Sequence, residues 1–173
     1  MLSVFHFRPF IFLVFILSYS FLTADIKILH EAPTPEEFVA LRSICKMRER
    51  SLISAKKGIK NSLFWVTLRL EGQLIGMGRV IGDGGTVAQI SDIAVHPDYQ
   101  KQGYGKLILE HIHEYILNEI PDDAFVCLFA EKDVALFYQK LGYIISSDQW
   151  PGMYWPCADR KRIKSEILHF VVP

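Results

Sequence analysis

The spacing of apolar side chains predicts that strands and helices alternate along this chain. A strand shows a period of two, whereas a helix returns apolar side chains every three to four positions. From the N-terminal side these rules give a strand at 25–30, a helix that starts after the capping residue Thr34, a second helix at 51–60, and two strands at 63–70 and 73–81. Glu71-Gly72 between the last two strands favours a tight hairpin turn.

The second half of the chain continues this alternation. The pattern predicts a strand at 87–95, a polar turn at 96–102, a long helix at 103–117, a strand at 124–130, a helix that ends at Gly142, and strands at 143–145 and 153–155. The run at 124–130 is wholly apolar, so this strand is expected to be buried on both faces. In the following helix, Val134, Leu136, Phe137 and Leu141 are expected to point inward. Together these elements indicate an α/β domain with about seven strands and four helices.

The first 24 residues differ from the rest of the chain. Phe10 to Leu22 is almost wholly apolar and is shorter than the ~20 residues of a transmembrane helix. Residues 1–24 therefore fit a signal-like segment, a short membrane anchor or a mis-set start, and membrane contact is expected only if they are retained. The folded domain is predicted at 25–156, followed by a tail at 157–173.

Composition excludes several classes of protein. Half of the 173 residues are hydrophobic, 22% are charged and the formal net charge is zero, which indicates a globular domain and gives no sign of a nucleic-acid partner. The three cysteines are widely spaced, form no C-x-x-C pair and predict no metal site. Their odd number fits a reduced, intracellular protein better than a disulfide framework.

The most informative segment is the turn between the strand at 87–95 and the helix that follows it. Gly103 and Gly105 open this helix, with Lys101 and Lys106 beside them. The first N–H groups of a helix have no partner within it, and glycine lets an anion approach the backbone, so this turn is expected to hold phosphate. The spacing fits neither a Walker loop nor a three-glycine dinucleotide fingerprint.

Gln100 to Gly105 has the form Q-x-x-G-x-G, directly preceded by Asp92-Ile93-Ala94-Val95-His96-Pro97. This combination resembles the acetyl-CoA pyrophosphate loop of the GNAT acetyltransferase superfamily. The resemblance implies a mixed sheet in which strands four and five splay apart, with the pantetheine arm of acetyl-CoA pairing in the gap. By the match, the arm would meet the backbone of Ile93, Ala94 and Val95. The pyrophosphate would lie on Gln100, Lys101, Gln102, Gly103, Tyr104, Gly105 and Lys106.

A second segment, Ala135 to Tyr143, resembles the family pattern A-x-x-F/L-Y-x-x-x-G-F. The match implies that Tyr138 is the general acid that protonates the leaving thiolate. A phenol with a pKa of about 10 keeps its proton at neutral pH and can pass it to a sulfur that is gaining charge. A packed helix tyrosine is the alternative.

The general base is harder to assign. Several family members carry a glutamate on the fourth strand, where this chain has Gln89 and Ser91 as the nearest positions. Asp92 is the only carboxylate of that strand and is the candidate base, although alternation places it on the opposite face unless a bulge turns it. A buried structural role for Asp92 is the alternative. Glu131, His96 or a water chain to solvent are further possibilities.

The resemblance therefore implies an acetyl-CoA-dependent N-acetyltransferase that acts on a primary amine of a small molecule or peptide. A non-catalytic CoA-binding or sensing module is the alternative. In the early helical pair, Arg48, Arg50 and Lys56 either contact the acceptor or are solvated surface charge. A cytoplasmic location is expected, with a membrane-anchored form as the alternative, and the tail leaves a homodimer open.

Overall fold

A computed structural model describes residues 25–146 of the chain. This part divides after Leu128 into two compact units, so that the sheet lies in the first unit and residues from Phe129 onward lie in the second. The first unit carries a five-stranded sheet in the order β1-β2-β3-β4-β5. Its strands are β1 (Ile26–Leu29), β2 (Phe64–Leu70), β3 (Gln73–Gly82), β4 (Val87–Val95) and β5 (Phe125–Leu128). Neighbouring strands are antiparallel except for β4 and β5, which are parallel.

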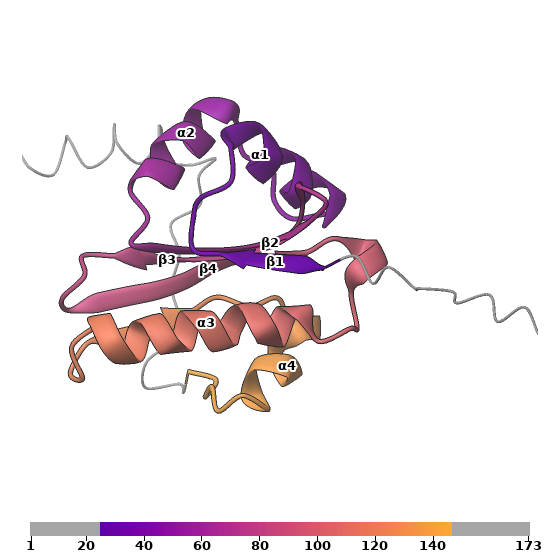
Figure 1. Cartoon of the computed structure of the whole chain (residues 1–173). Helices are drawn as coiled ribbons and strands as arrows, with labels where there is room; N and C mark the ends of the chain where they lie inside the picture. Colours follow the sequence, from indigo (N-terminus) through magenta and orange to yellow (C-terminus); the bar gives the residue numbers. More distant parts are fainter. Residues whose placement is uncertain (1–24, 147–173) are drawn as a thin grey trace, which may run out of the picture. The chain divides into compact units, whose positions relative to one another are not determined.

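Helices cover both faces of this sheet. α1 (Pro35–Ile44) and α2 (Leu52–Lys60) lie over one face, and α3 (Tyr104–Glu119) lies along the other, as Figure 1 shows. A short 3-10 helix, η1 (Pro97–Tyr99), connects β4 to the loop before α3. The second unit contains the 3-10 helix η2 (Lys132–Val134) and α4 (Ala135–Gln139).

The predicted start of the first helix is confirmed. Thr34 Oγ1 accepts from the N–H of Glu37 at 3.2 Å, and the N–H of Thr34 donates to Glu37 Oε2 at 2.8 Å. This reciprocal pair satisfies backbone groups that a helix end otherwise leaves without partners. Arg69 on β2 donates to both carboxylate oxygens of Glu37, so the same residue also joins α1 to the sheet.

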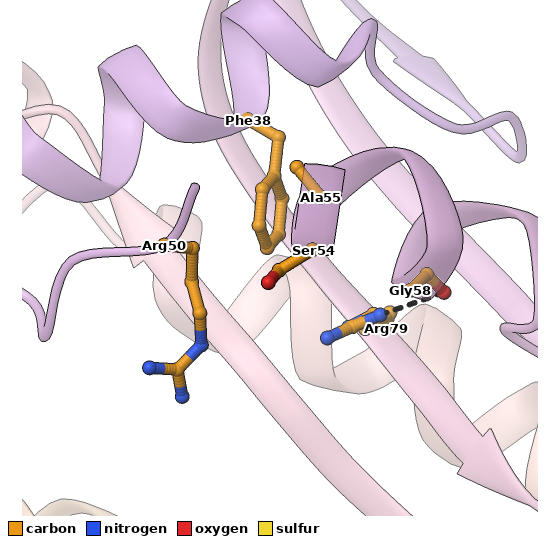
Figure 2. A pocket seen from close by; sticks show the side chains of 6 residues that line it. All are labelled: Phe38, Arg50, Ser54, Ala55, Gly58 and Arg79. Carbon is orange, nitrogen blue, oxygen red and sulfur yellow. Dashed lines mark hydrogen bonds between the residues drawn. The ribbon is translucent and has the colours of Figure 1, made fainter. Parts of the chain in front are cut away.

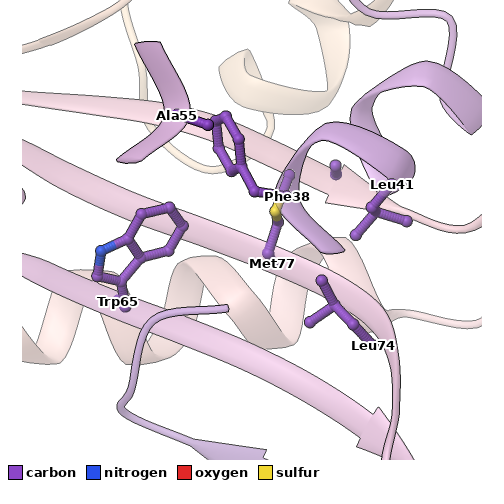
Figure 3. Close-up of a cluster of buried hydrophobic side chains, with 7 residues drawn as sticks. Phe38, Leu41, Ala55, Trp65, Leu74 and Met77 are labelled. Carbon is purple, nitrogen blue, oxygen red and sulfur yellow. The ribbon is translucent and has the colours of Figure 1, made fainter. Parts of the chain in front are cut away.

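A hydrophobic cluster fills the space between the sheet and the α1–α2 pair. Its buried members are Phe38, Leu41, Ala55, Trp65, Leu74, Met77 and Ala94, most of which are labelled in Figure 3. Phe38 packs edge-on against Trp65, with their ring centroids 6.0 Å apart. Because burial of apolar surface is the main favourable term in folding, this cluster fixes α1 and α2 over the sheet.

On the opposite face, α3 approaches β3 closely at two glycines. A Cβ atom built on Gly78 would lie 2.5 Å from Ile93 Cδ1 and 2.6 Å from Ile108 Cγ2, and one on Gly76 would lie 3.3 Å from Ile108 Cδ1. A glycine inside a strand often marks the close approach of another element, and here that element is α3. Ile108 and Ile112 are fully buried as a result.

The expected seven strands are not confirmed. Within residues 25–146 the sheet has five strands, and 143–145 are not in a strand. The strand expected at 153–155 lies outside the described residues. β5 is also shorter than the predicted 124–130, and its predicted burial on both faces is wrong, because Phe125 is 67% exposed. Among the described residues β5 pairs with β4 alone, and a strand with a neighbour on one side lacks the cover of a central strand.

The inward face predicted for the fourth helix is only partly present. Phe137 and Leu141 are half-buried, whereas Leu136 is 68% exposed and Val134 is 43% exposed. Helical geometry explains Leu136, because neighbouring side chains diverge by about 100° around the axis and Leu136 lies off the stripe that contains Phe137 and Leu141. Val134 belongs to η2 rather than to α4.

Candidate active site

The two parallel strands at the edge of the sheet pair over only part of their length. The register runs from Val87 opposite Phe125 to Ile90 opposite Leu128, where β5 ends. The remaining residues of β4, Ser91–Val95, have no β5 partner, although several of them pair with β3. We call Ser91–Val95 the unpaired stretch of β4. The loss of pairing falls where the resemblance to the GNAT superfamily implies that strands four and five diverge. It leaves one edge of this stretch without a strand partner in the described fold.

A β-bulge occurs in the same stretch of β4. Ser91 is opposite Arg79 and Ala94 is opposite Met77, so Asp92 and Ile93 together face the single residue Gly78. Asp92 has a φ of 57°, the left-handed region that aspartate tolerates better than most residues. The bulge turns Asp92 onto the face that carries Arg79 and α1, whereas simple alternation placed it on the opposite face from Ser91.

The carboxylate of Asp92 is occupied by two guanidinium groups. Arg42 Nη1 on α1 donates to Oδ1, and Arg79 Nε on β3 donates to Oδ2 at 2.5 Å. Only 8% of Asp92 is exposed. Both oxygens therefore accept from guanidinium groups, and the carboxylate is the counter-charge of two largely buried cations. This geometry favours the structural alternative for Asp92.

Arg42 is more deeply buried than Arg79, the other arginine that donates to Asp92. Its Nη2 donates to the carbonyl of Arg48 at 2.6 Å, and its guanidinium lies 5.5 Å from the centre of the Phe38 ring. Burial lowers the pKa of Arg42, Asp92 opposes this effect, and the charges of Arg50 and Arg79 lower the pKa further. Around Arg42, the positive charges of three arginines therefore exceed the single negative charge of Asp92.

The predicted phosphate loop leads into a helix end without a protein cap. Gly103, at the N-cap position of α3, has a φ of 90° and makes no side-chain capping bond, and the first turn of α3 has no acidic residue. Lys101 also has a left-handed φ of 60°. The first intrahelical bond is from Leu107 N–H to Gly103 O, so no described residue accepts from the N–H groups of Tyr104, Gly105 and Lys106. This is the arrangement that binds an anion.

The two glutamines of this loop bond back to the protein. Gln100 Nε2 donates to the carbonyl of Val95 at 2.9 Å, and Gln102 Nε2 donates to the carbonyl of Asp98 at 3.2 Å. The Val95 carbonyl also accepts from Cys45 Sγ at 3.3 Å. These side chains therefore hold the loop against the end of β4, which leaves the exposed Lys101 and Lys106 as its charged groups.

Tyr138 lies in the second unit, on α4, and its role as the general acid stays a prediction. Its ring packs edge-on against that of Tyr143, with centroids 5.7 Å apart. Burial raises the pKa of Tyr138, and burial together with Tyr138 raises the pKa of Tyr143 to about 12. The Tyr138 hydroxyl is therefore protonated at neutral pH, as a general acid must be.

Sequence reasoning missed Arg42 and Arg79. A signal for them exists, because Arg42 shares the buried side of α1 with Phe38 and Leu41, and Arg79 stands alone in an apolar strand. Charges in apolar segments need partners, and Asp92 is the one carboxylate in a neighbouring apolar strand. Among residues 25–146 no group of three or more His, Cys, Asp or Glu side chains could hold a metal ion.

The fold and this loop define an acetyltransferase class, and comparison with known proteins agrees. The model of the acetyltransferase (GNAT) domain matches residues 60–145. A Staphylococcus aureus crystal structure described as a probable acetyltransferase is 45% identical, with a TM-score of 0.72, and the match covers 76% of this chain and 99% of that one. The chain belongs to the GNAT superfamily.

Curated relatives give the same assignment over a shorter span. The uncharacterized N-acetyltransferase ycf52 of Pyropia yezoensis is 34% identical over 62% of this chain and 63% of its own length. The chloroplastic GCN5-related N-acetyltransferase 2 of Arabidopsis thaliana is 39% identical over 49% of this chain and 32% of its own length. The chain thus spans less than two thirds of the curated relatives it matches.

Proposed function

We propose that this protein is an acetyl-CoA-dependent N-acetyltransferase that acts on a primary amine. The observation that carries the proposal is the end of β4–β5 pairing at Ile90, followed along the chain by a loop and by helix N–H groups that no described residue accepts from. The part of β4 beyond Ile90 would offer backbone groups to the extended pantetheine arm. The N–H groups at the start of α3 would offer donors to the diphosphate. They follow one another along the chain in the order that acetyl-CoA requires.

Acetyl-CoA would supply the acetyl group as a thioester, and the residues of unit one would hold it. The N–H groups of Tyr104, Gly105 and Lys106 would face the pyrophosphate, with Lys101 adding charge. Ile93 and Ala94 would offer the backbone groups for the pantetheine arm. Val95 was expected to share this role, but its carbonyl already accepts from Gln100 and Cys45, so we assign the arm mainly to the other two.

For the chemical step we propose Tyr138 as the proton donor to the departing sulfur. We propose that Asp92 acts by holding Arg42 and Arg79, because both its oxygens are engaged. The proton of the incoming ammonium would then leave through water along the face that carries Gln89 and Ser91. The small-molecule or peptide amine is the partner class.

The compartment follows from the cofactor. We propose that the protein lies in a compartment that contains acetyl-CoA. This compartment is the cytoplasm or, by analogy with the chloroplastic relative from Arabidopsis, the plastid. Across residues 25–146 no helix is both long and apolar enough to cross a membrane. Fractionation of the full chain against a version that starts at Asp25 tests the tether expected from residues 1–24, and identical behaviour of the two would refute it.

Calorimetry with acetyl-CoA, joined to an assay for free CoA over a panel of amines, tests the proposed function. We expect saturable binding and amine-dependent CoA release. Absence of binding at millimolar acetyl-CoA would sink the proposal.

A non-catalytic CoA-binding module is the second candidate. It is favoured by one observation, namely that the single carboxylate of β4 is held by two arginines. This candidate predicts binding of CoA without release of free CoA from acetyl-CoA over the whole panel. Turnover of any amine decides against it.

A further inference from the structure

A cavity of about 90 Å³ lies on the α1–α2 side of the sheet, beside the Arg42–Asp92–Arg79 cluster. Figure 2 shows the residues that line it, which are Phe38, Arg50, Ser54, Ala55, Gly58 and Arg79. In that view the guanidinium groups of Arg50 and Arg79 lie on either side of Phe38 and Ser54. We call this space the Arg50–Arg79 cavity.

Arg79 presents a fixed guanidinium group to the cavity. Its Nε donates to Asp92, and its Nη1 donates to the carbonyl of Gly58 at 3.0 Å and to Ser62 Oγ at 3.1 Å. The guanidinium also lies 5.3 Å from the centre of the Trp65 ring. No described residue accepts a hydrogen bond from its Nη2. A donor that is already held in place loses little entropy when a ligand binds to it.

Arg50 forms the exposed side of the cavity. Its Nη1 donates to the carbonyl of Glu49 at 3.1 Å, and its Nε and Nη2 have no acceptor within the described part of the chain. Between the two arginines, Ser54 Oγ accepts from Ser51 Oγ at 3.0 Å, which leaves the hydroxyl proton of Ser54 for another acceptor. The wall therefore presents several donors, and no carboxylate lines it.

Charge is out of balance around this cavity. Three guanidinium groups, those of Arg42, Arg50 and Arg79, lie near one carboxylate, that of Asp92. The imbalance extends along the chain, since 46–60 contains one acidic residue, Glu49, and the cations Lys46, Arg48, Arg50, Lys56, Lys57 and Lys60, although the whole chain is neutral. Buried charges of one sign are stabilised by a counter-charge, and an anion in the cavity would supply it.

The cavity shares a sheet face with the unpaired stretch of β4. Arg79 lines the cavity and is opposite Ser91, the first residue of β4 beyond the β5 pairing. We propose that the Arg50–Arg79 cavity binds the anionic group, a carboxylate or a phosphate, of the amine acceptor. This inference rests on the proposed function, because it names the acceptor class of that same site. Phe38 would contact the carbon chain between the anion and the amine.

Paired acceptors that differ in charge test the proposal in the full chain. An amino acid is compared with its amide, and an aminoalkyl phosphate with the corresponding amino alcohol, by release of free CoA. We expect kcat/KM to be about tenfold or more higher for the anionic member, the effect of one charge-assisted hydrogen bond. Equal or faster turnover of the neutral members overturns the proposal and leaves the acetyltransferase function standing. The two pairs separate a carboxylate from a phosphate source.

Variants of single cations test whether Arg50 causes the preference for anionic acceptors. Arg50→Gln is expected to raise KM about tenfold for anionic acceptors with little change in kcat, and to leave neutral acceptors unchanged. Arg50→Lys should recover part of the loss. Lys60→Gln removes the same charge from the far end of α2 and should change neither acceptor class. An equal loss for both classes in Arg50→Gln would show that the arginine is structural and contradict the proposal.

A measurement on the protein alone separates this inference from the proposed function. Inorganic phosphate and acetate are titrated while the guanidinium N–H signals are followed by NMR. We expect saturable shifts of the Arg79 Nε–H signal that are lost in Arg50→Gln and kept in Lys60→Gln. Saturable shifts without any binding of acetyl-CoA would reject the enzyme and retain the anion site. Shifts that do not saturate, or that persist in Arg50→Gln, reject the anion site.

Discussion

Arg79 on β3 and Asp92 on β4 face each other across neighbouring strands, with Arg79 Nε donating to Asp92 Oδ2 at 2.5 Å. The contact exists because the bulge at Asp92 turns this side chain toward α1. Since Arg79 also donates to the carbonyl of Gly58, one side chain connects the unpaired stretch of β4 to α2. The pair thus joins Ser91–Val95, the stretch of β4 that we propose pairs with acetyl-CoA, to the wall of the Arg50–Arg79 cavity.

Asp92→Asn is expected to destabilise the fold by about 3 kcal/mol or more, because it leaves two largely buried guanidinium groups without their counter-charge. Denaturant unfolding measures the change. The enzyme that remains folded should keep the pH profile of the wild type, since the proposed role of Asp92 is to hold Arg42 and Arg79. Unchanged stability with abolished turnover would restore Asp92 as the base.

Gly103→Ala is expected to weaken acetyl-CoA binding, because a Cβ disfavours the left-handed φ of 90° that shapes the loop. Gly72→Ala is the matched control, with a φ of 85° in a hairpin and no atom near the added Cβ. Both should lose about 1 kcal/mol of stability, but only Gly103→Ala should change the calorimetric affinity. Gly103→Asp adds a negative charge beside the diphosphate and should weaken binding further. Equal affinities for the two alanine variants would remove the loop from the site.

Gly78→Ala is expected to cost about 1–3 kcal/mol of stability, because the new methyl would overlap Ile93 and Ile108. Gly85→Ala is the control, since its nearest neighbour, Asp83 Oδ1, is 4.0 Å away. Thermal unfolding compares the two. Because Ile93 belongs to the unpaired stretch of β4, acetyl-CoA affinity should fall as well in Gly78→Ala. Similar unfolding midpoints for the two variants would contradict the close approach of α3.

Tyr138→Phe is expected to lower kcat by about 100-fold with little effect on acetyl-CoA affinity, because it removes only the proposed proton donor. Tyr115→Phe on α3, where the ring stacks on Phe64, is the control and should keep wild-type kcat. Burial raises the pKa of Tyr138 above its ordinary value of 10.0, and an acid is lost as pH rises through its pKa. Loss of activity through deprotonation of Tyr138 should therefore occur at higher pH than for a tyrosine with the ordinary pKa. Unchanged turnover in Tyr138→Phe removes it from the mechanism.

The Glu37–Arg69 pair is expected to contribute to stability in a defined pH range. Hydrogen bonds from Arg69 lower the pKa of Glu37 from 4.5 to about 2. A lowered carboxyl pKa gives stability that is present above 4.5 and is lost as pH falls toward 2. Glu37→Gln should lose about 1 kcal/mol near neutral pH, after allowance for solvent screening, and should show a flatter decline in acid. Glu36→Gln, an exposed change in the same helical turn, should behave as the wild type in denaturant titrations across this range.

Several features followed directly from local sequence. The helix start at Thr34 was readable because a capping residue lies directly before the helix that it caps. β4 has the predicted bounds, and the open helix start at Gly103 lies where the glycines predicted it. Periodicity, capping and glycine preference depend on a few neighbouring residues, so they can be predicted from local sequence alone.

Other features depended on strands and helices meeting in space. The bulge at Asp92 arises from the register of β4 against β3, and a single strand carries no record of its partner's register. For this reason alternation placed Asp92 on the wrong face, and Arg42 and Arg79 were not recognised as its partners. The Arg50–Arg79 cavity likewise needs α1, α2 and β3 together. The sequence alone determined the family, the loop and the strand before it, whereas tertiary packing decided which charges are buried together, because the energies of burial and ion pairing depend on distances between residues far apart in the chain.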